Sequence, residues 1–330
     1  MKAILNKLIN QEPLSSEEAQ NVLVNISKGK YNHTQIAAFV TVYMMRSITI
    51  DELKGFRDAL LELCIPVDLS DYNTIDLCGT GGDAKDTFNV STLATFITAG
   101  AGVQVAKHGN YGVSSASGSS NVMEAIGITF TNKTAALKKS LEDANICFLH
   151  APLFHPAMKK MAPVRQDLGL KTFFNMLGPM VNPSFPKNQL VGVFNLELQR
   201  IYGYLYQDTD INYSIVHALD GYDEISLTGN TKIITNHSET ILTPKDLNLS
   251  PIEPAALYGG KSVKSSAKTF LKIINGDGKE AQNNVVCANA GLAIAMVKKV
   301  SHAEGFELAK ESLLTLKAKA SLNKLIALSH

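Results

Sequence analysis

The stretch from Asp76 to Thr92 reads DLCGTGGDAKDTFNVST, and it decides the fold that we predict for this chain. The apolar run TIDLC at its start is typical of a buried strand. Gly79, Gly81 and Gly82 then allow the backbone to take positive φ and to approach a ligand closely. The segment FNVST that follows is suited to beginning a helix, with Asn89 near its cap. Two interpretations are open: an ordinary strand-to-helix turn, or a turn whose N–H groups bind phosphate.

Outward from this stretch, strand-like and helix-like segments alternate over residues 71–330. The strand-like runs are NTIDLCG, VQVAKHG, ICFLHA, QLVGVFN and NYSIVHALDG. Such alternation predicts an α/β domain with a mostly parallel central sheet. Ligands of these sheets bind at the carboxyl ends of the strands, and the glycine-rich and polar segments of this chain follow its apolar runs.

Residues 1–70 are predicted to form a small all-helical domain. Three segments have helical periodicity, and the first of them offers Ser15 or Ser16 as its N-cap: PLSSEEAQNVLVNIS, NHTQIAAFVTVYMMR and TIDELKGFRDALLELC. A further helical stretch at about 160–180 interrupts the strand–helix alternation. We expect it to join the helical domain, which would make that domain discontinuous.

Composition bounds the class of protein. The chain has 330 residues, 45% hydrophobic and 18% charged, with net charge +1, which suits a globular protein with one large and one smaller domain. The small net charge argues against a general nucleic-acid binder. The four cysteines form no CxxC pair, so we expect a reducing, cytoplasmic location. No apolar stretch reaches the roughly 20 residues of a membrane span, and no membrane contact is expected.

A second polar segment, VAKHGNYGVSSASGSSN, again follows a predicted strand. It places Lys107, His108, Asn110 and several serines around three glycines, a combination that suits a polyphosphate. The alternative is a solvated Ser/Gly linker, although linkers seldom separate an apolar strand from an apolar helix within one α/β unit.

Two further segments carry charged side chains. HALDGYDEISL gathers Asp220, Asp223 and Glu224 after a strand; such carboxylates are most often solvated, but beside a phosphate site they could hold Mg²⁺. VRQDLGLKTFFNMLGP contains Arg165, which is either a surface ion-pair partner or a ligand of a substrate carboxylate. His150 and His155 lack metal-site spacing and are expected to be structural or to line a pocket.

In this order and spacing, the segments resemble those of anthranilate phosphoribosyltransferases: GTGGD with FNVST, KHGN…SS…SGSSNVMEAIG, RQDLGLKTFFNMLGPMVNP and LDGYDEIS. The resemblance runs from the N-terminal helices to at least Thr228. It implies a small helical domain and a larger α/β domain of the nucleoside phosphorylase/phosphoribosyltransferase-like kind, with the active site in the cleft between them. It also implies a cytoplasmic homodimer that transfers the 5-phosphoribosyl group of phosphoribosyl pyrophosphate to the amine of anthranilate, the second step of tryptophan biosynthesis.

The resemblance further implies the roles of individual residues. The expected contacts of phosphoribosyl pyrophosphate are Gly79, Gly82, Asp83, Thr87, Asn89, Val90, Ser91, Thr92, Lys107, His108, Gly109, Asn110, Tyr111, Gly112, Val113, Ser114, Ser115 and Ser119. Anthranilate would contact Gly79, Asn110 and Arg165. Two Mg²⁺ ions would be held by Ser91, Asp223 and Glu224.

Four positions depart from the pattern of the family. Tyr111 stands where Arg is frequent, Asn121 where Asp is expected, Lys171 where Arg is expected, and Ala218 where Gly is common. Two other kinds of protein are alternatives at the level of sequence. Pyrimidine nucleoside phosphorylases share a GTGG-type loop but have a differently built second motif, resembling KxSGRxLGxTGGTxDKLE. A nucleic-acid-binding relative would need a basic groove and eroded phosphate motifs.

Overall fold

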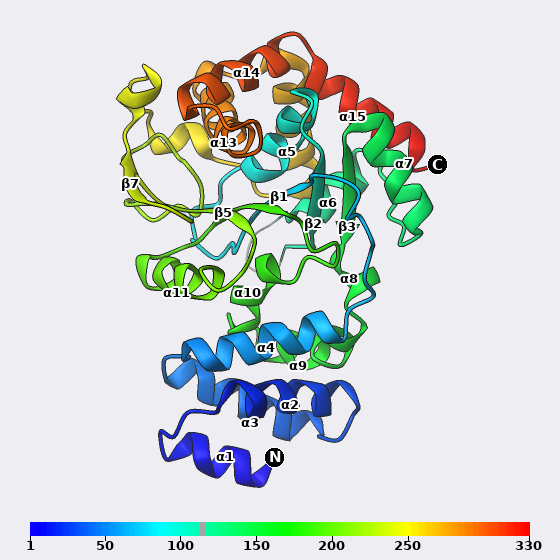
Figure 1. The fold of residues 1–330 in the computed structure, drawn as a ribbon, viewed down its shortest axis with the longest axis vertical. Helices are drawn as coiled ribbons and strands as arrows, with labels where there is room; N and C mark the ends of the chain where they lie inside the picture. Colours follow the sequence, from blue (N-terminus) through cyan, green and yellow to red (C-terminus); the bar gives the residue numbers. More distant parts are fainter. Residues whose placement is uncertain (113–116) are drawn as a thin grey trace. The chain divides into compact units, whose positions relative to one another are not determined.

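The computed structural model describes residues 1–112 and 117–330, and this part of the chain divides into two compact units (Figure 1). The first, here called the helical unit, comprises residues 1–67 and 151–183; the second, the α/β unit, comprises residues 68–150 and 184–330. Val113, Ser114 and Ser115, which the resemblance implies as substrate contacts, lie outside the described residues.

The helical unit contains seven α-helices among its described residues: α1 (Lys2–Ile9), α2 (Ser16–Ser27), α3 (His33–Met45), α4 (Ile50–Glu62), α8 (Ala151–Phe154), α9 (Ala162–Leu168) and α10 (Phe174–Leu177). Helices α2, α3 and α4 each begin with a capping box, at Ser15, Asn32 and Thr49 respectively. In each box the cap side chain and the side chain three residues later satisfy two helix-end N–H groups. The N-cap that the sequence left open is therefore Ser15.

Aromatic rings form the core of the helical unit, and they come from both of its chain segments. Phe39, Tyr43 and Phe56 are buried in the first segment, and Phe173 of the second stacks on Phe56 with centroids 4.5 Å apart. The Phe173 ring also packs against Tyr43 at 5.1 Å. Residues 151–183 thus supply part of the core on which the N-terminal helices close.

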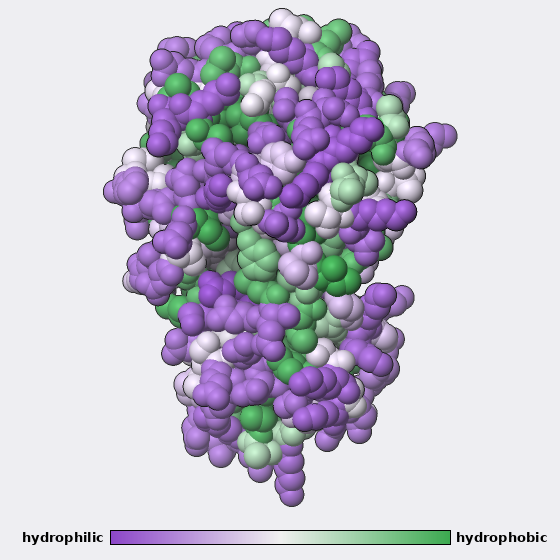
Figure 2. Space-filling model, turned by 45° about the vertical axis from the view of Figure 1, so that its right-hand side comes forward, coloured by the Kyte–Doolittle hydropathy of each residue, from purple (hydrophilic) through white to green (hydrophobic). Residues whose placement is uncertain are grey.

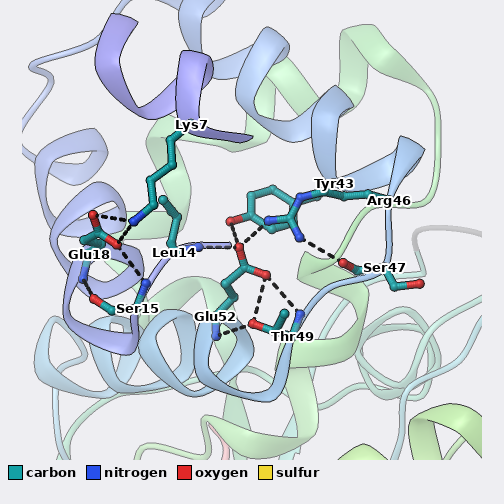
Figure 3. Close-up of polar contacts among 9 residues, drawn as sticks. All are labelled: Lys7, Leu14, Ser15, Glu18, Tyr43, Arg46, Ser47, Thr49 and Glu52. Atoms are coloured by element: carbon teal, nitrogen blue, oxygen red, sulfur yellow. Dashed lines mark hydrogen bonds and ion pairs between the residues drawn. The ribbon is translucent and has the colours of Figure 1, made fainter. Parts of the chain in front are cut away.

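A buried carboxylate joins α3, α4 and the segment that precedes α2 (Figure 3). Glu52 is fully buried, and it accepts hydrogen bonds from the Leu14 N–H and the Tyr43 hydroxyl, each at 2.9 Å, and from the Thr49 N–H at 2.9 Å. It also forms an ion pair with Arg46. Burial alone would raise the pKa of Glu52, but Arg46 and these hydrogen bonds outweigh burial and lower the pKa.

The α/β unit is built on a seven-stranded sheet of order β3-β2-β1-β4-β5-β6-β7. Its strands are β1 (Ile75–Gly79), β2 (Val105–Gly109), β3 (Ile146–His150), β4 (Asn188–Gly192), β5 (Asn212–Ala218), β6 (Thr231–Thr235) and β7 (Glu239–Leu242). The first five strands pair in parallel, whereas β5–β6 and β6–β7 are antiparallel. The predicted fold class, a helical domain with a mostly parallel α/β domain, is confirmed.

Helices cover both faces of this sheet (Figure 1). They are α5 (Val90–Gly100), α6 (Ser119–Ala125), α7 (Thr134–Ala144), α11 (Leu196–Tyr206), α12 (Val263–Lys272), α13 (Glu280–Lys298), α14 (His302–Leu314) and α15 (Lys317–Leu328). Helices α5 and α13 lie on one face and α11 on the other. The apolar core between β1 and α5 includes Ile75, Leu77, Leu93 and Phe96, all at most 1% exposed. Burying this face fixes the register of the strands whose ends carry the polar turns.

Hydrophilic side chains cover most of the face shown in Figure 2. Among residues 1–112 and 117–330, no helix combines the length and the apolar character that crossing a membrane requires.

Candidate active site

The glycine-rich turn lies between β1 and α5 and has an unusual backbone. Gly81 and Gly82 have φ of 62° and 81°, and the non-glycine residues Ala84 and Asp86 also have positive φ, 59° and 50°. Alternating backbone of this kind is found in anion-binding turns. Within the protein, the Thr80 N–H donates to the Gly192 carbonyl at 2.9 Å and the Lys85 N–H to Asp83 at 3.2 Å. Glycine at 81 and 82 therefore serves the conformation of the turn itself.

The acidic turn after β5 is bonded directly to the glycine-rich turn. The Gly81 N–H donates to Asp223 Oδ2 at 2.7 Å. At Gly79 there is no room for a side chain, since a Cβ would lie 2.5 Å from the same carboxylate oxygen. A Cβ at Gly192, the last residue of β4, would collide with the Asp223 carbonyl oxygen. The ends of β1 and β4 thus converge on one residue of the turn after β5, Asp223.

Asp83, Asp223 and Glu224 form an acidic cluster at this point. Burial raises the pKa of Asp223, and the neighbouring charge of Asp83 raises it further. Burial also raises the pKa of Glu224, with Asp223 and Asp83 adding to the effect. Oε1 of Glu224 is buried and has no hydrogen-bond partner among the described residues. Like charges held this close without a cation repel one another.

This donor set fits a magnesium ion that shares its ligands with a substrate. Mg²⁺ prefers oxygen ligands and is usually bound by one or two carboxylates together with phosphates and water. Within the described part of the chain, no three His, Cys, Asp or Glu side chains form a complete metal cage. Buried, mutually repelling carboxylates with an unpartnered oxygen are what a cation completed by diphosphate oxygens would neutralise.

Neighbouring side chains position the acidic cluster. A hydrogen bond from the Thr87 side chain partly offsets the raised pKa of Glu224. The Lys85 ammonium lies over the Tyr222 ring, 4.7 Å from its centroid. Asp220, by contrast, accepts a hydrogen bond from Thr228 within its own turn. Two of the three acidic residues of the LDGYDEIS segment therefore face the glycine-rich turn, and Asp220 is engaged elsewhere.

Helix α5 begins directly behind the glycine-rich turn. Its N-cap residue is Asn89, but the Asn89 side chain does not cap the helix; it donates to the Ser117 carbonyl at 3.1 Å. Because no side chain caps α5, its first N–H groups keep the character of an anion site, and Val90, Ser91 and Thr92 form the first turn. The Asn89 amide also ties this turn to the second polar loop.

The second loop follows β2, and its two ends are fastened together. The Ser120 N–H donates to the Asn110 carbonyl at 3.1 Å. Oδ1 of Asn121 accepts from the N–H groups of Gly112 at 2.9 Å and Gly118 at 3.0 Å. One side chain therefore fixes both ends of the segment around residues 113–116. We name residues 110–112 with 118–121 the loop neck.

His150 and His155 have packing roles in the structure. The His150 ring stacks on Phe130, with centroids 4.3 Å apart, and its Nδ1 lies 2.8 Å from Ser120 Oγ. Nε2 of His155 is 2.8 Å from the Val181 carbonyl oxygen, to which it donates, and burial lowers the pKa of His155 to about 4. His150 thereby supports the helix α6 that follows the loop neck.

Arg165 belongs to the helical unit, in α9. Its guanidinium lies 5.5 Å from the centroid of Phe174, and Nη2 is 3.5 Å from Asn175 Oδ1. No Asp or Glu forms an ion pair with Arg165 among the residues described, so the surface-ion-pair interpretation receives no support. Burial lowers its pKa. An aromatic ring and an amide hold this cation without neutralising it, which suits an anionic ligand.

The chain matches both domains of a known enzyme family. The helical bundle domain of the glycosyl transferase family matches residues 2–64, and the a/b domain of that family matches residues 71–319. An anthranilate phosphoribosyltransferase of Flavobacterium johnsoniae is 67% identical over 329 residues, covering 100% of both chains. That of Christiangramia forsetii is 66% identical over 330 residues, again covering 100% of both. The chain belongs to the anthranilate phosphoribosyltransferase family.

Solved structures of the family have the same fold. The anthranilate phosphoribosyltransferase of Thermus thermophilus is 31% identical, with a TM-score of 0.90 and 98% of each chain covered. The Saccharomyces cerevisiae enzyme in complex with PRPP and Mg is 25% identical, with a TM-score of 0.90, 98% of this chain and 96% of that chain covered.

The structure explains two of the departures from the family pattern. Asn121 acts through one oxygen that accepts two N–H groups, a task that needs an acceptor but no negative charge. Tyr111 donates to Glu124 Oε1 at 2.7 Å and packs edge-on against His150, with centroids 4.9 Å apart. Tyr111 is thus anchored to α6. Lys171 is exposed and Ala218 is buried at the end of β5; nothing in the structure explains why these two residues differ.

The sequence patterns did not predict three residues that the structure places at the site. Gly192 ends the run QLVG, and a glycine at the carboxyl end of a strand could have marked a close backbone approach. Asn175 lies ten residues after Arg165, where no pattern connects them. Asp76 is a charged residue within TIDLC, which predicts a buried strand. Because a buried carboxylate needs a hydrogen-bond or charge partner, its position could have marked it as part of a site.

Proposed function

We propose that this chain transfers the 5-phosphoribosyl group from phosphoribosyl pyrophosphate to the amine of anthranilate, giving N-(5-phosphoribosyl)anthranilate and pyrophosphate. The observation that carries the proposal is the bond from the glycine-rich turn to the acidic turn, Gly81 N–H to Asp223. It brings together the two elements that a metal-bound diphosphate requires, a glycine-rich turn leading into a helix N-terminus and a group of carboxylates. The full-length relatives that bear the enzyme's name support the same conclusion.

The diphosphate and ribose end of the substrate is assigned to the α/β unit. We propose that it contacts the glycine-rich turn, the first turn of α5 and the loop neck with Lys107. Two Mg²⁺ ions would be held by Ser91, Asp223 and Glu224, and when bound they would neutralise the charge that gathers on the leaving diphosphate. The N–H groups of the turn and of the α5 N-terminus stabilise that charge without reorganising.

Anthranilate is assigned to Arg165, together with Asn110 and Gly79. The carboxylate of anthranilate pairs with the guanidinium, which has no carboxylate partner among the described residues. The aryl amine is neutral at pH 7, so the attack on C1 of the ribose requires orientation more than a strong base. This agrees with a site built of anion-binding groups and carboxylates.

The family further suggests a cytoplasmic homodimer. Within the helical unit, Ile9 is 64% exposed and Met45 is 82% exposed. Singly exposed apolar side chains are common on monomers, so the proposal that N-terminal helices form the dimer rests on the family, and these side chains mark positions at which it can be tested. Sedimentation of the wild type against Met45→Glu tests it, with a monomeric wild type as the opposing result.

Depletion of anthranilate fluorescence in the presence of phosphoribosyl pyrophosphate tests the activity. We expect depletion that requires Mg²⁺, and thermal stabilisation of the protein by phosphoribosyl pyrophosphate with Mg²⁺. Either of two results would contradict the proposed activity and favour another function. Phosphate-dependent cleavage of a pyrimidine nucleoside without anthranilate turnover would indicate a nucleoside phosphorylase. Retention on heparin at moderate salt without turnover would indicate a nucleic-acid-binding relative.

A further inference from the structure

Strands β1 and β2 pair at a single position. Their register consists of Ile75 with Val105 alone, whereas β1 pairs with β4 over five residues and β2 pairs with β3 over five. Beyond that first pair, side chains take the place of the ladder. The His108 N–H donates to Asp76 Oδ1 at 3.2 Å, and Lys107 Nζ donates to the Leu77 carbonyl at 2.5 Å. We call this part of the β1–β2 boundary, where side chains bond to the backbone of the neighbouring strand, the split.

The two side chains in the split carry opposite charges and are almost completely buried. Asp76 is 0% exposed and Lys107 is 2% exposed. Burial lowers the pKa of Lys107, while the charge of Asp76, followed by that of Cys78, raises it in part. Both of these groups lie on β1. An ammonium group in such a place stays protonated only with a compensating anion close by.

We propose that Asp76 is a positioning residue of the transferase site: its carboxylate fastens β2 next to Lys107 through the His108 N–H and supplies the counter-charge of the buried Lys107 ammonium. The proposal deepens the function proposed above and rests on it for the role of Lys107 toward the diphosphate. Asp76 lies on β1, inside the sheet, and it acts through Lys107, which lies on the neighbouring strand β2. Without the carboxylate, burial would act on the Lys107 ammonium with less opposition and would favour its neutral form, which has no charge to attract a polyanion.

The pKa of Lys107 provides a test that does not depend on turnover. The ε-carbon shifts of ¹³C-labelled lysines are followed by NMR as a function of pH, and Lys107 is assigned by the signal that disappears in Lys107→Gln. We expect Asp76→Asn to lower the pKa of Lys107 by about 1–3 units. The control is Asp71→Asn, which removes an exposed carboxylate paired with Lys138 and should leave Lys107 unchanged.

The kinetic test asks whether Asp76 acts through Lys107. We expect Asp76→Asn to lower kcat/KM for phosphoribosyl pyrophosphate about tenfold or more at pH 8 and to move the alkaline limb of its pH profile downward. In the Lys107→Gln background, the same substitution should change kcat/KM by less than about twofold. A loss of equal size in both backgrounds, with an unchanged pH profile, would mean that Asp76 only supports the fold and would overturn the inference.

Two further outcomes separate this inference from the proposed function. A wild type without transferase activity, combined with a lowered Lys107 pKa in Asp76→Asn, rejects the function and supports the pairing of Asp76 with Lys107. An active wild type with an unchanged Lys107 pKa in Asp76→Asn rejects the inference alone. If Asp76→Asn does not fold, Asp76→Glu keeps the charge and moves it by one methylene. It should retain the alkaline limb and lower kcat/KM, and an unaltered kcat/KM would count against positioning.

Discussion

The helical unit and the α/β unit each bury carboxylates, but they treat them in opposite ways. Glu52 in the helical unit has Arg46 and four further hydrogen-bond donors around it, and its pKa is lowered. Asp223 and Glu224 in the α/β unit face each other and Asp83, and their pKa values are raised. A satisfied buried charge holds helices together, whereas an unsatisfied one costs stability and creates affinity for a cation.

The largest effect is expected from neutralising the unsatisfied carboxylates. Asp223→Asn with Glu224→Gln should lower kcat by more than about 10³-fold at any Mg²⁺ concentration, because the metal loses its charged ligands. The stability of the unliganded protein should stay the same or rise, since like-charge repulsion is removed. Steady-state kinetics and thermal unfolding measure the two quantities.

Asp220→Asn is the matched control for this pair, because Asp220 lies in the same turn but bonds to Thr228. It should retain turnover within a few-fold. Undiminished turnover in the double variant would remove the metal role from the acidic turn.

Removing the charge of Glu52, whose hydrogen-bond and ion-pair partners are all in place, should affect stability and leave catalysis unchanged. Glu52→Gln leaves the nearly buried Arg46 guanidinium without its counter-charge, and we expect the free energy of unfolding to fall by about 3–5 kcal/mol. Glu18→Gln, which removes the charge of the half-buried partner of Lys7, should cost less than about 1 kcal/mol. Chemical denaturation checks both, and a loss for Glu52→Gln no larger than that for Glu18→Gln would contradict the comparison.

Arg165 is a charge of the helical unit that has no ion-pair partner among the described residues. Arg165→Ala should raise KM for anthranilate by the equivalent of about 1.5–3 kcal/mol, the worth of a charged hydrogen-bond pair. KM for phosphoribosyl pyrophosphate should change little. If only that second constant moves, the assignment of Arg165 to anthranilate is wrong.

The loop neck predicts a smaller effect on the same kinetics. Asn121→Leu removes the oxygen that accepts the N–H groups of Gly112 and Gly118. We expect KM for phosphoribosyl pyrophosphate to rise by the equivalent of about 1 kcal/mol. Asn121→Asp keeps the acceptor and should stay within about threefold of the wild type. Equal losses in the two variants would show that shape, and not the accepted hydrogen bonds, sets the neck.

The smallest expected effect is a pH dependence of stability. The lowered pKa of Glu52 means that its share of stability is fully present above the unfolded-state pKa, about 4.3, and is lost as the pH falls through the folded-state pKa. The difference in unfolding free energy between wild type and Glu52→Gln should therefore be constant at neutral pH and narrow below about pH 4. A difference that widens in acid would contradict the sign of this shift.

Local patterns in the sequence predicted much of the α/β unit. The five parallel strands appear as apolar runs followed by glycine or polar residues, because such strands are buried on both faces. Strands β6 and β7 were missed, although TKIIT and ETIL are β-branched runs separated by the turn residues NHS. Their alternation is short, and an antiparallel edge hairpin carries no binding motif.

The site was harder to predict than the fold, because its contacts join distant parts of the chain. The glycine-rich turn and the acidic turn were each visible, but the bond between residues 81 and 223 depends on the order of the strands in the sheet. The sequence could not predict the proposed role of Asp76, because that role depends on β1 and β2 pairing at a single position. The implied contacts of individual residues with substrates stay predictions.

The shared aromatic core of the helical unit has a consequence for how the chain is made. Phe56 leaves the ribosome long before Phe173, its stacking partner, has been translated. The first 67 residues must therefore wait, incompletely packed, while three strands of the other unit are synthesised. The helical unit is complete only when residue 183 has been translated. The centre of the sheet, where β4 pairs with β1, forms only after that point.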